Sequence, residues 1–321
     1  MLMALRAELR SRNWFAECGI AEPRLADYLD LVALGTVADV VPLDANNRIL
    51  VAGGLSRIRA GHCRPGIRAL LELAARTPAT TVAADLGFAV APRLNAAGRL
   101  DDMSVGIECL LADDDARALA LAEQLHALNS ERRAIEREMR EQADAALSQL
   151  DWRALQTPPA GLVLYQPGWH QGVIGILASR VKDQWHRPTV ALAVGDPGLL
   201  KGSARSVAGV LIRDAVDCVA SQHPGLLHKF GGHAMAAGLT LERDRLEAFE
   251  QAFAAAVARQ LDAVEMEAVL ESDGDLAPAE LDLETATALR YAGPWGQHFP
   301  EPQFDGRFRL LQQRLVGGHH L

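Results

Sequence analysis

The sequence predicts an α/β protein with two or three domains, and three observations support this prediction. The chain has 321 residues, of which 49% are hydrophobic, and this is enough apolar material for more than one buried core. Apolar residues at helical spacing dominate the first half of the chain. After residue 158, short apolar runs alternate with a helical segment, as in a βαβ unit.

Composition argues against several classes of protein. No apolar run is long enough to span a bilayer, and residues 1–8 lack the features of a secretory signal. Cys18, Cys63, Cys109 and Cys218 form no CxxC pair, which argues against a zinc site and a disulfide framework. The net charge of −9 gives no sign of a nucleic-acid partner, although the local field of a groove decides such binding. We therefore expect a cytoplasmic protein with reduced thiols.

Residues 1–106 are expected to be mostly helical. The spacing of apolar residues predicts three helices, over residues 23–34, 47–60 and 67–75. Between and after them, compact turns rich in glycine, alanine or proline are expected over residues 35–42 and 91–99.

Residues 113–149 are expected to form one long helix. Three aspartates lie at its start, where the helix dipole favours anions. Its apolar stripe consists of Leu121, Leu125, Leu128, Ile135 and Met139. Arg132 interrupts the stripe, so a coiled coil is the weaker interpretation, and we expect a helix that connects two lobes.

A new unit is expected to begin at residues 158–159. A buried strand over residues 162–165, a helix over 172–184 and a strand over 189–194 predict a parallel pair of strands. The later elements expected are a strand ending at residues 201–206, a turn at 229–233, helices over 244–261 and 280–290, and strand-like segments over 268–271 and 303–315.

Asp39 is the first candidate for chemistry. It follows an apolar helix and precedes an apolar turn, so its carboxylate should emerge at the end of an element. Mg²⁺ and Mn²⁺ prefer oxygen ligands of this kind. A single aspartate after a helix is more often a cap or turn residue, and both interpretations stay open.

The segment over residues 168–175 joins a strand to a helix. The free N–H groups of a helix N-terminus, together with Gly172 and Gly175, would let a phosphate approach closely. Trp169 and His170 could contact a base or a phosphate. The structural alternative is a glycine-rich turn with a packed tryptophan, and this segment alone does not decide between them.

Three further segments combine small residues with polar or cationic ones. Ser203 and Arg205 lie at a strand end and suit a phosphodiester backbone. Gly231, Gly232 and His233 form a tight turn that permits close approach. The third segment contains Arg93, Asn95 and Arg99. Each segment also has an ordinary structural explanation, as a polar strand end, a structural histidine or surface arginines.

Together these segments predict a phosphate-binding cleft between two lobes, with metal chemistry on one side. The sequence has no cues for a Ser–His–Asp or Cys–His site for acyl transfer. It also has no Walker loop and no GxGxxG motif.

Five motifs follow one another along the chain. They are LVALGTVADVVPL (31–43), PRLNAAGRLDD (92–102), WHQGVIGILASR (169–180), GSARS (202–206) and FGGHAMAAG (230–238). This series resembles the RecJ family of the DHH phosphoesterase superfamily, and the resemblance covers nearly the whole chain. The segment GPWGQHFPEPQFDG (293–306) is similar to the opening of that family's OB-like domain.

The resemblance implies four parts of the chain. They are the C-terminal part of a DHH nuclease domain (1–112), a connecting helix (113–150), an α/β DHH-associated domain that binds substrate (151–262) and a truncated, β-rich OB-like domain (263–321). It also implies a hydrolase, an exonuclease that degrades single-stranded DNA 5′→3′ in recombination and repair with Mn²⁺ or Mg²⁺. A repair partner such as single-strand-binding protein would suit this role.

The resemblance assigns roles to particular residues. Asp39 would be a metal ligand and, with His170, part of the catalytic set. Contacts to DNA or phosphate would come from Arg93, Asn95, Arg99, Trp169, Gly172, Ser203, Arg205, Gly231, Gly232 and His233.

The chain departs from the family in one respect. The family's first three motifs, an Asp-x-Asp pair, a further Asp and an Asp-His-His triplet, are absent, and no DHH string occurs. One carboxylate cannot hold two divalent ions. We therefore interpret the chain as truncated at both ends and expect little nuclease activity from it alone. Two alternatives remain, a phosphodiesterase of the superfamily acting on small or cyclic nucleotides and a non-catalytic single-strand-binding fragment.

Overall fold

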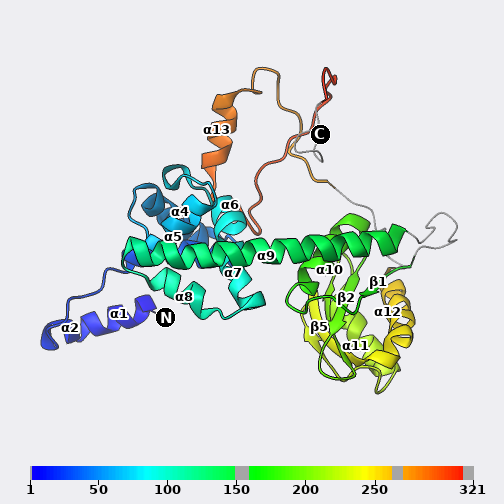
Figure 1. The fold of residues 1–321 in the computed structure, drawn as a ribbon. Helices are drawn as coiled ribbons and strands as arrows, with labels where there is room; N and C mark the ends of the chain where they lie inside the picture. The colour runs from blue at the N-terminus through cyan, green and yellow to red at the C-terminus, as the bar shows by residue number, and fades with distance from the viewer. Residues whose placement is uncertain (1, 149–158, 262–269, 314–321) are drawn as a thin grey trace. The chain divides into compact units, whose positions relative to one another are not determined.

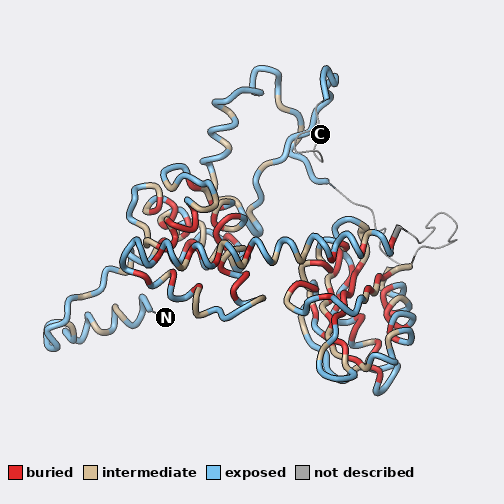
Figure 2. Tube along the Cα trace, in the orientation of Figure 1, coloured by how far each residue is buried: buried red, intermediate tan, exposed pale blue. Residues whose placement is uncertain are grey.

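The computed structural model describes residues 2–148, 159–261 and 270–313. The described chain divides into two compact units (Figure 1). The first contains the residues up to Leu94, Ser104–His126 and the C-terminal segment from Leu270, and the second contains Asn95–Met103 and the residues from Ala127 onward to the end of α12. Each unit has its own buried core (Figure 2).

The first unit is helical. Its elements are α1 (Leu2–Ser11), α2 (Trp14–Glu17), η1 (Leu25–Tyr28), α3 (Leu29–Ala38), α4 (Ala45–Arg59), α5 (Pro65–Leu73), η2 (Pro78–Thr80), α6 (Ala83–Asp85), η3 (Leu86–Val90), α8 (Ser104–Leu111) and α13 (Leu283–Ala292). Helices α7 (Ala91–Leu100) and α9 (Asp115–Ser148) contribute residues to both units.

Helices α3 and α4 approach each other closely at a glycine. A Cβ atom on Gly54 would lie 2.2 Å from the carbonyl oxygen of Leu29 and 2.5 Å from the Cβ of Ala33. Only glycine permits this spacing, and Leu55 and Ile58 beside it are buried. The contact fixes the position of α3 against α4. It therefore also fixes the position of Asp39, which directly follows the last residue of α3.

Asp30 anchors the N-terminal end of α3. Its residue is 1% exposed, and its carboxylate accepts the backbone N–H groups of Leu31 and Arg64, each at 2.8 Å. A buried carboxylate is costly unless it is hydrogen-bonded. These two bonds therefore tie α3 to the loop before α5.

The second unit is a five-stranded sheet with helices on both faces (Figure 1). The strands are β1 (Leu162–Tyr165), β2 (Thr189–Val194), β3 (Leu199–Arg205), β5 (Ala236–Glu242) and β4 (Lys229–Gly232), in that spatial order. β1 and β2 are parallel, and the other pairs are antiparallel. One face packs against α10 (Ile174–Trp185) and the second half of α9. The other face packs against α11 (Ile212–Gln222) and α12 (Leu246–Leu261), which follows η4 (Arg243–Arg245).

Several predictions from the sequence are confirmed. The βαβ unit has its parallel pair, the third strand ends at Arg205, and the long helix is α9. The helices expected near residues 47–60, 67–75, 172–184, 244–261 and 280–290 are present within a few residues of those bounds. No described helix is long and apolar enough to cross a membrane.

Other predictions are wrong. The segment 91–99 is helix α7 rather than a turn, because α6, the π-helical η3 and α7 follow one another without a break and Pro92 lies just after the π-helical stretch. Of the turn expected at 229–233, Lys229–Gly232 form strand β4, which is paired to β5. Helix α3 extends into the turn expected at 35–42. Residues 303–313 and 270–271 are not strand, and the rest of those two expected segments lies outside the described residues.

The α3–α4 contact can be tested with a matched pair of glycines. Gly54→Ala should lower the free energy of unfolding by about 1–3 kcal/mol, because the new methyl group meets backbone atoms. Gly35→Ala on α3 meets nothing within 4 Å and should be neutral or stabilising by up to about 1 kcal/mol. Urea unfolding followed by circular dichroism measures both. Equal effects would show that the close approach does not constrain position 54.

Candidate nucleic-acid interface

The face of the sheet that packs against α10 is only partly covered. On this face, Gly238 of β5 and Gly231 of β4 are exposed, whereas Ala237 and Leu239 on the opposite face are buried. Directly paired residues of antiparallel strands share a face. Ser203 pairs with Gly238, and Gly238 pairs with Gly231. A row of small residues, Ser203, Gly238 and Gly231, therefore crosses the open face from β3 to the edge strand β4.

Cationic side chains lie beside this row. The next row on the same face is Lys201, Thr240 and Lys229, and on the other side Arg205 pairs with Ala236. The face thus combines a floor without bulky side chains and three cations. Such a surface admits an extended phosphodiester backbone.

The first turn of α10 packs directly on β3. A Cβ atom on Gly175 would lie 2.9 Å from Nη2 of Arg205 and 3.1 Å from the hydroxyl oxygen of Ser203. The Arg205 guanidinium donates to that hydroxyl oxygen at 2.9 Å and to the carbonyl of Ala204 at 2.8 Å. Gly175 therefore allows the serine hydroxyl and the guanidinium to lie against the N-terminal turn of a helix.

Arg99 reaches the same helix end from α7. Its Nη1 donates to the carbonyl of Gly172 at 3.0 Å. A Cβ atom on Gly172 would lie 2.3 Å from the Arg99 carbonyl oxygen, so the two backbones are in close contact. Nδ1 of His170 accepts the Gly172 N–H at 3.1 Å, and the histidine is exposed.

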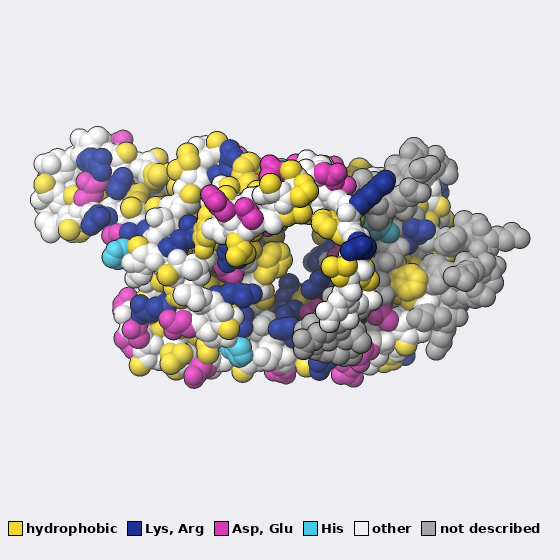
Figure 3. Space-filling view, turned by 90° about the horizontal axis from the view of Figure 1, so that it is seen from above, with side chains coloured by type: hydrophobic (Ala, Val, Ile, Leu, Met, Phe, Trp, Pro, Cys, Tyr) yellow, Lys and Arg dark blue, Asp and Glu magenta, His cyan; other side chains and the backbone are white. Residues whose placement is uncertain are grey.

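The two arginines carry charge that no nearby carboxylate neutralises. Among the described residues, neither Arg99 nor Arg205 has an ion pair with an aspartate or glutamate. Burial lowers the pKa of Arg205, and the neighbouring charge of Arg99 lowers it further. On the face drawn in Figure 3, Lys and Arg side chains lie among Asp and Glu side chains over much of the view. Two unneutralised cations side by side are the electrostatic signature of an anion site.

His233, another predicted residue, follows the edge strand β4 and lies near Arg205. The N–H of His233 donates to the carbonyl of Ala236 at 2.8 Å, so His233 and Arg205 lie on either side of Ala236. A Cβ atom on Gly232 would lie 2.3 Å from the Ala236 carbonyl oxygen, which makes glycine necessary there. His233 is exposed and available to a ligand.

Trp169 occupies a different environment from the one expected of a base contact. Its residue is 5% exposed and belongs to the core formed with Met139, Ala143 and Leu147 of α9. Its indole N–H donates to Oε1 of Gln142 at 2.8 Å. The ring therefore holds α9 against the sheet, and the structural alternative considered for this segment describes it.

The remaining predicted residues are divided between the units. Asn95 is exposed on the part of α7 that belongs to the second unit. Arg93 belongs to the first unit, where it donates to Nδ1 of His126 at 3.2 Å and to the carbonyl of Ala89 at 2.6 Å. Asp39 also belongs to the first unit and is the exposed C-cap of α3.

Asp39 does not form a metal centre with other described residues. Over residues 2–148, 159–261 and 270–313, no group of three histidine, cysteine, aspartate or glutamate side chains could hold an ion. A divalent ion needs several oxygen ligands. The described residues alone therefore do not fit a metal centre, and we assign no step of hydrolysis to them.

The sequence prediction missed Lys201 and Lys229. The sequence did contain a signal for Lys201, because Lys201, Ser203 and Arg205 are two apart in a strand and such residues point to one face. Lys229 could not be placed without knowing that β4 pairs with β5.

Comparison with known proteins supports the organisation of the chain. Residues 159–259 match the DHHA1 domain, and residues 272–321 match the RecJ OB domain. The chain is 63% identical over 321 residues to the single-stranded-DNA-specific exonuclease RecJ of Dickeya dadantii and 57% identical to that of Escherichia coli. Each alignment covers 100% of this chain and 56% of the relative. The chain therefore spans about half the length of these curated relatives.

Solved structures of RecJ proteins are also similar to this chain. RecJ of Thermus thermophilus in complex with Mg²⁺ superimposes with a TM-score of 0.73 at 33% identity, over 90% of this chain and 43% of that one. The complex with Mn²⁺ gives a TM-score of 0.71 at 35% identity, over 90% and 41%. In sequence over its whole length and in structure over most of it, this chain is similar to RecJ proteins, and it contains matches to the DHHA1 domain and the RecJ OB domain.

Proposed function

We propose that this chain supplies the strand-holding site of a single-stranded-DNA-specific exonuclease. The observation that carries the proposal is the pair of unneutralised guanidinium groups of Arg99 and Arg205, with the Ser203 hydroxyl, at the first turn of α10. Guanidinium, hydroxyl and helix N-terminal groups are the donors that bind phosphate. In this proposal they hold the phosphate at the 5′ end of the strand.

The open face of the sheet would hold the nucleotides that follow. The row of Ser203, Gly238 and Gly231 leaves room for the sugar–phosphate backbone, and Lys201 and Lys229 lie beside it. These groups address phosphate rather than base edges, so binding should be independent of sequence and should weaken as salt is raised. Single-stranded DNA is thus the proposed partner, and the cytoplasm is the proposed location. Single-strand-binding protein stays a predicted protein partner.

Hydrolysis would require metal ligands in addition to Asp39. We propose that Asp39 is one carboxylate of a Mn²⁺ or Mg²⁺ site, on the strength of its place in the GTVADVVPL motif. His170, which is exposed at the same helix end as Arg99, is proposed to belong to the catalytic set through contact with phosphate. Oxygen-rich ligation of several carboxylates is what such ions need.

Phosphate holding is tested by binding to a 5′-phosphorylated oligonucleotide. Arg205→Ala should weaken binding by about 10- to 100-fold, because charge-assisted hydrogen bonds are lost. Arg213→Ala, which removes an exposed arginine from α11 on the opposite face, is the control and should bind normally. Fluorescence anisotropy measures both variants.

A 5′-hydroxyl oligonucleotide locates the contact. If Arg205 holds the terminal phosphate, its substitution should affect the phosphorylated strand much more than the hydroxyl strand. An equal loss on both strands would assign Arg205 to the internal backbone. An Arg213→Ala defect as large as that of Arg205→Ala would reject the open face as the binding site.

Nuclease activity is expected to be absent or minimal for this chain alone, because it provides one carboxylate of the proposed metal site. The measurement is release of labelled mononucleotides from a 5′-phosphorylated strand with Mn²⁺. Rapid release that is lost in Asp39→Ala would show that other residues of the chain complete the site. Hydrolysis of dinucleotides without attack on long strands would instead support a phosphodiesterase for small substrates.

A further inference from the structure

A short segment near the C-terminus packs on the helices of the first unit. This segment, Gly293–Phe299, is here named the aromatic clamp. The rings of Trp295 and Phe299 stack with centroids 5.1 Å apart, and the Arg48 guanidinium of α4 lies 4.0 Å from the Phe299 centroid. The Trp295 indole N–H donates to the carbonyl of Leu289 at 2.9 Å. The clamp is thus fixed to both α13 and α4.

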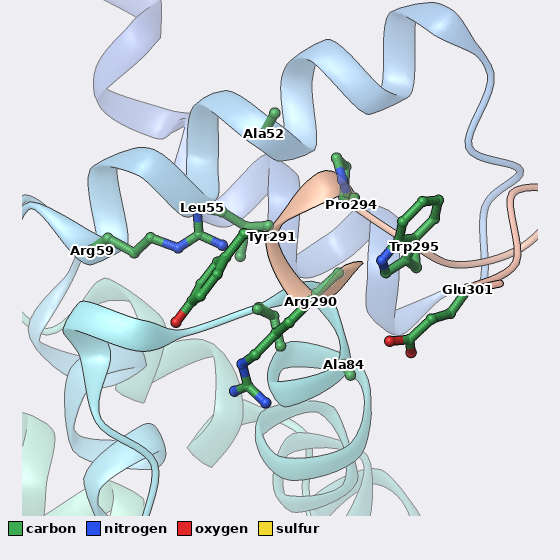
Figure 4. Close-up of a pocket in the computed structure, with 12 residues that line it drawn as sticks. Ala52, Leu55, Arg59, Ala84, Arg290, Tyr291, Pro294, Trp295 and Glu301 are labelled. Carbon is green, nitrogen blue, oxygen red and sulfur yellow. The ribbon is translucent and has the colours of Figure 1, made fainter. Parts of the chain in front are cut away.

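Beside the clamp, α13 lies against α4 and α6 around a small cavity (Figure 4). The cavity has a volume of about 150 Å³, and its lining includes Arg59, Tyr291, Pro294 and Trp295. The Arg59 guanidinium lies 5.2 Å from the Tyr291 ring centroid. The C-terminal segment is therefore seated on this helical unit by several aromatic and cationic contacts.

The clamp contacts the loop that follows Asp39. The backbone N–H of Leu43 donates to the carbonyl of Gln297 at 2.8 Å. A Cβ atom on Gly296 would lie 2.8 Å from Cδ1 of Leu43, whose residue is 3% exposed. Two bonds at the downstream end complete the loop, the Asp44 side chain accepting the Asn47 N–H and the Asn47 side chain donating to the Pro42 carbonyl.

The same loop contains a strained residue. Val40, directly after Asp39, has φ 54°, a left-handed conformation that a β-branched residue rarely adopts. The N–H groups of Val40 and Val41 close the end of α3 by donating to the carbonyls of Val37 and Thr36. Strain of this kind persists only where surrounding contacts hold the backbone in place.

No described side chain holds the Asp39 carboxylate. The residue is exposed, and its backbone N–H donates to the carbonyl of Gly35, but no hydrogen bond or ion pair to its side chain occurs among the described residues. The backbone of the loop therefore sets the position of the Asp39 Cα–Cβ bond, from which the carboxylate projects. Whatever fixes Val40 to Leu43 also fixes Asp39.

We propose that the aromatic clamp is a positioning element for Asp39. The clamp holds Leu43, the loop between Leu43 and the end of α3 stays in its strained conformation, and the Cα–Cβ bond of Asp39 keeps one direction. Its role in catalysis rests on the proposed function, in which Asp39 is a metal ligand. The mechanical claim, that the clamp orders the Asp39 loop, stands independently of that function.

The experiment measures amide hydrogen exchange over residues 39–44 in the whole chain. Trp295→Ala should speed exchange at Leu43 and its neighbours by about tenfold, the effect of one lost backbone hydrogen bond. The matched control is Phe308→Ala, in the same C-terminal segment with a residue that is 78% exposed, and it should leave exchange unchanged.

Two rescue variants separate positioning from general packing. Trp295→Phe keeps a ring to stack on Phe299 and should restore protection of the loop. Val40→Gly relieves the left-handed strain and should restore part of the protection in the Trp295→Ala background. Amides in the middle of α3 and α4 should exchange normally in all variants.

Three results would overturn the proposal. The first is unchanged exchange at residues 40–43 in Trp295→Ala. The second is faster exchange throughout α3 and α4, which would make Trp295 a general core residue of the first unit. The third is no rescue by either Trp295→Phe or Val40→Gly. Failure of the exonuclease proposal would leave these exchange rates unaffected, so the two claims fail separately.

Discussion

The close contact between the first turn of α10 and strand β3 is the constraint on which the proposed phosphate-binding face depends. It exists because position 175 has no side chain, so that Ser203 and Arg205 lie directly beneath the helix end. A larger residue there would have to displace the guanidinium. The same helix end receives Arg99 through the carbonyl of Gly172. Two glycines thus bring together, from a helix and a strand far apart in sequence, the donors that phosphate requires.

The same contact bears on how an acidic protein would bind a polyanion, as we propose for this chain. The net charge of −9 would repel DNA if it were spread evenly. Ion pairs neutralise the charge of many of the other arginines; Arg132 and Arg180, for example, both pair with Glu136. Arg99 and Arg205 are bonded only to neutral oxygens among the described residues. Because fields act locally and are screened over about 8 Å at physiological salt, these two cations outweigh the distant acidic surface.

Sequence reasoning recovered the elements whose pattern is local. The long helix is readable because its apolar residues recur at helical spacing, and the strand at residues 189–194 is readable because it is a short, continuously apolar run that is buried on both faces. Predictions from the sequence are wrong where tertiary contacts determine the secondary structure of a segment. The segment 91–99 was assigned to a turn for its small residues, yet it packs as helix α7, and β5 went unseen because Ala236–Glu242 is rich in small residues. Ser203 and Arg205 stay predictions from their chemistry, whereas the burial of Trp169 depends on its contacts with α9, which no local pattern reveals.

The first unit shows that a residue's neighbours in sequence do not always determine its geometry. Asp39 ends an ordinary apolar helix, but the next residue adopts a backbone conformation that valine disfavours. The helix-closing bonds of Val40 and Val41 account for the upstream half of that loop, and the Asp44 cap accounts for its downstream end. Leu43, between them, finds its partner in Gln297, more than two hundred residues later in the chain. In this proposal, a segment that matches the RecJ OB domain therefore also supports an acidic residue in the helical unit, and its removal would release that loop while leaving the proposed phosphate-binding residues in place.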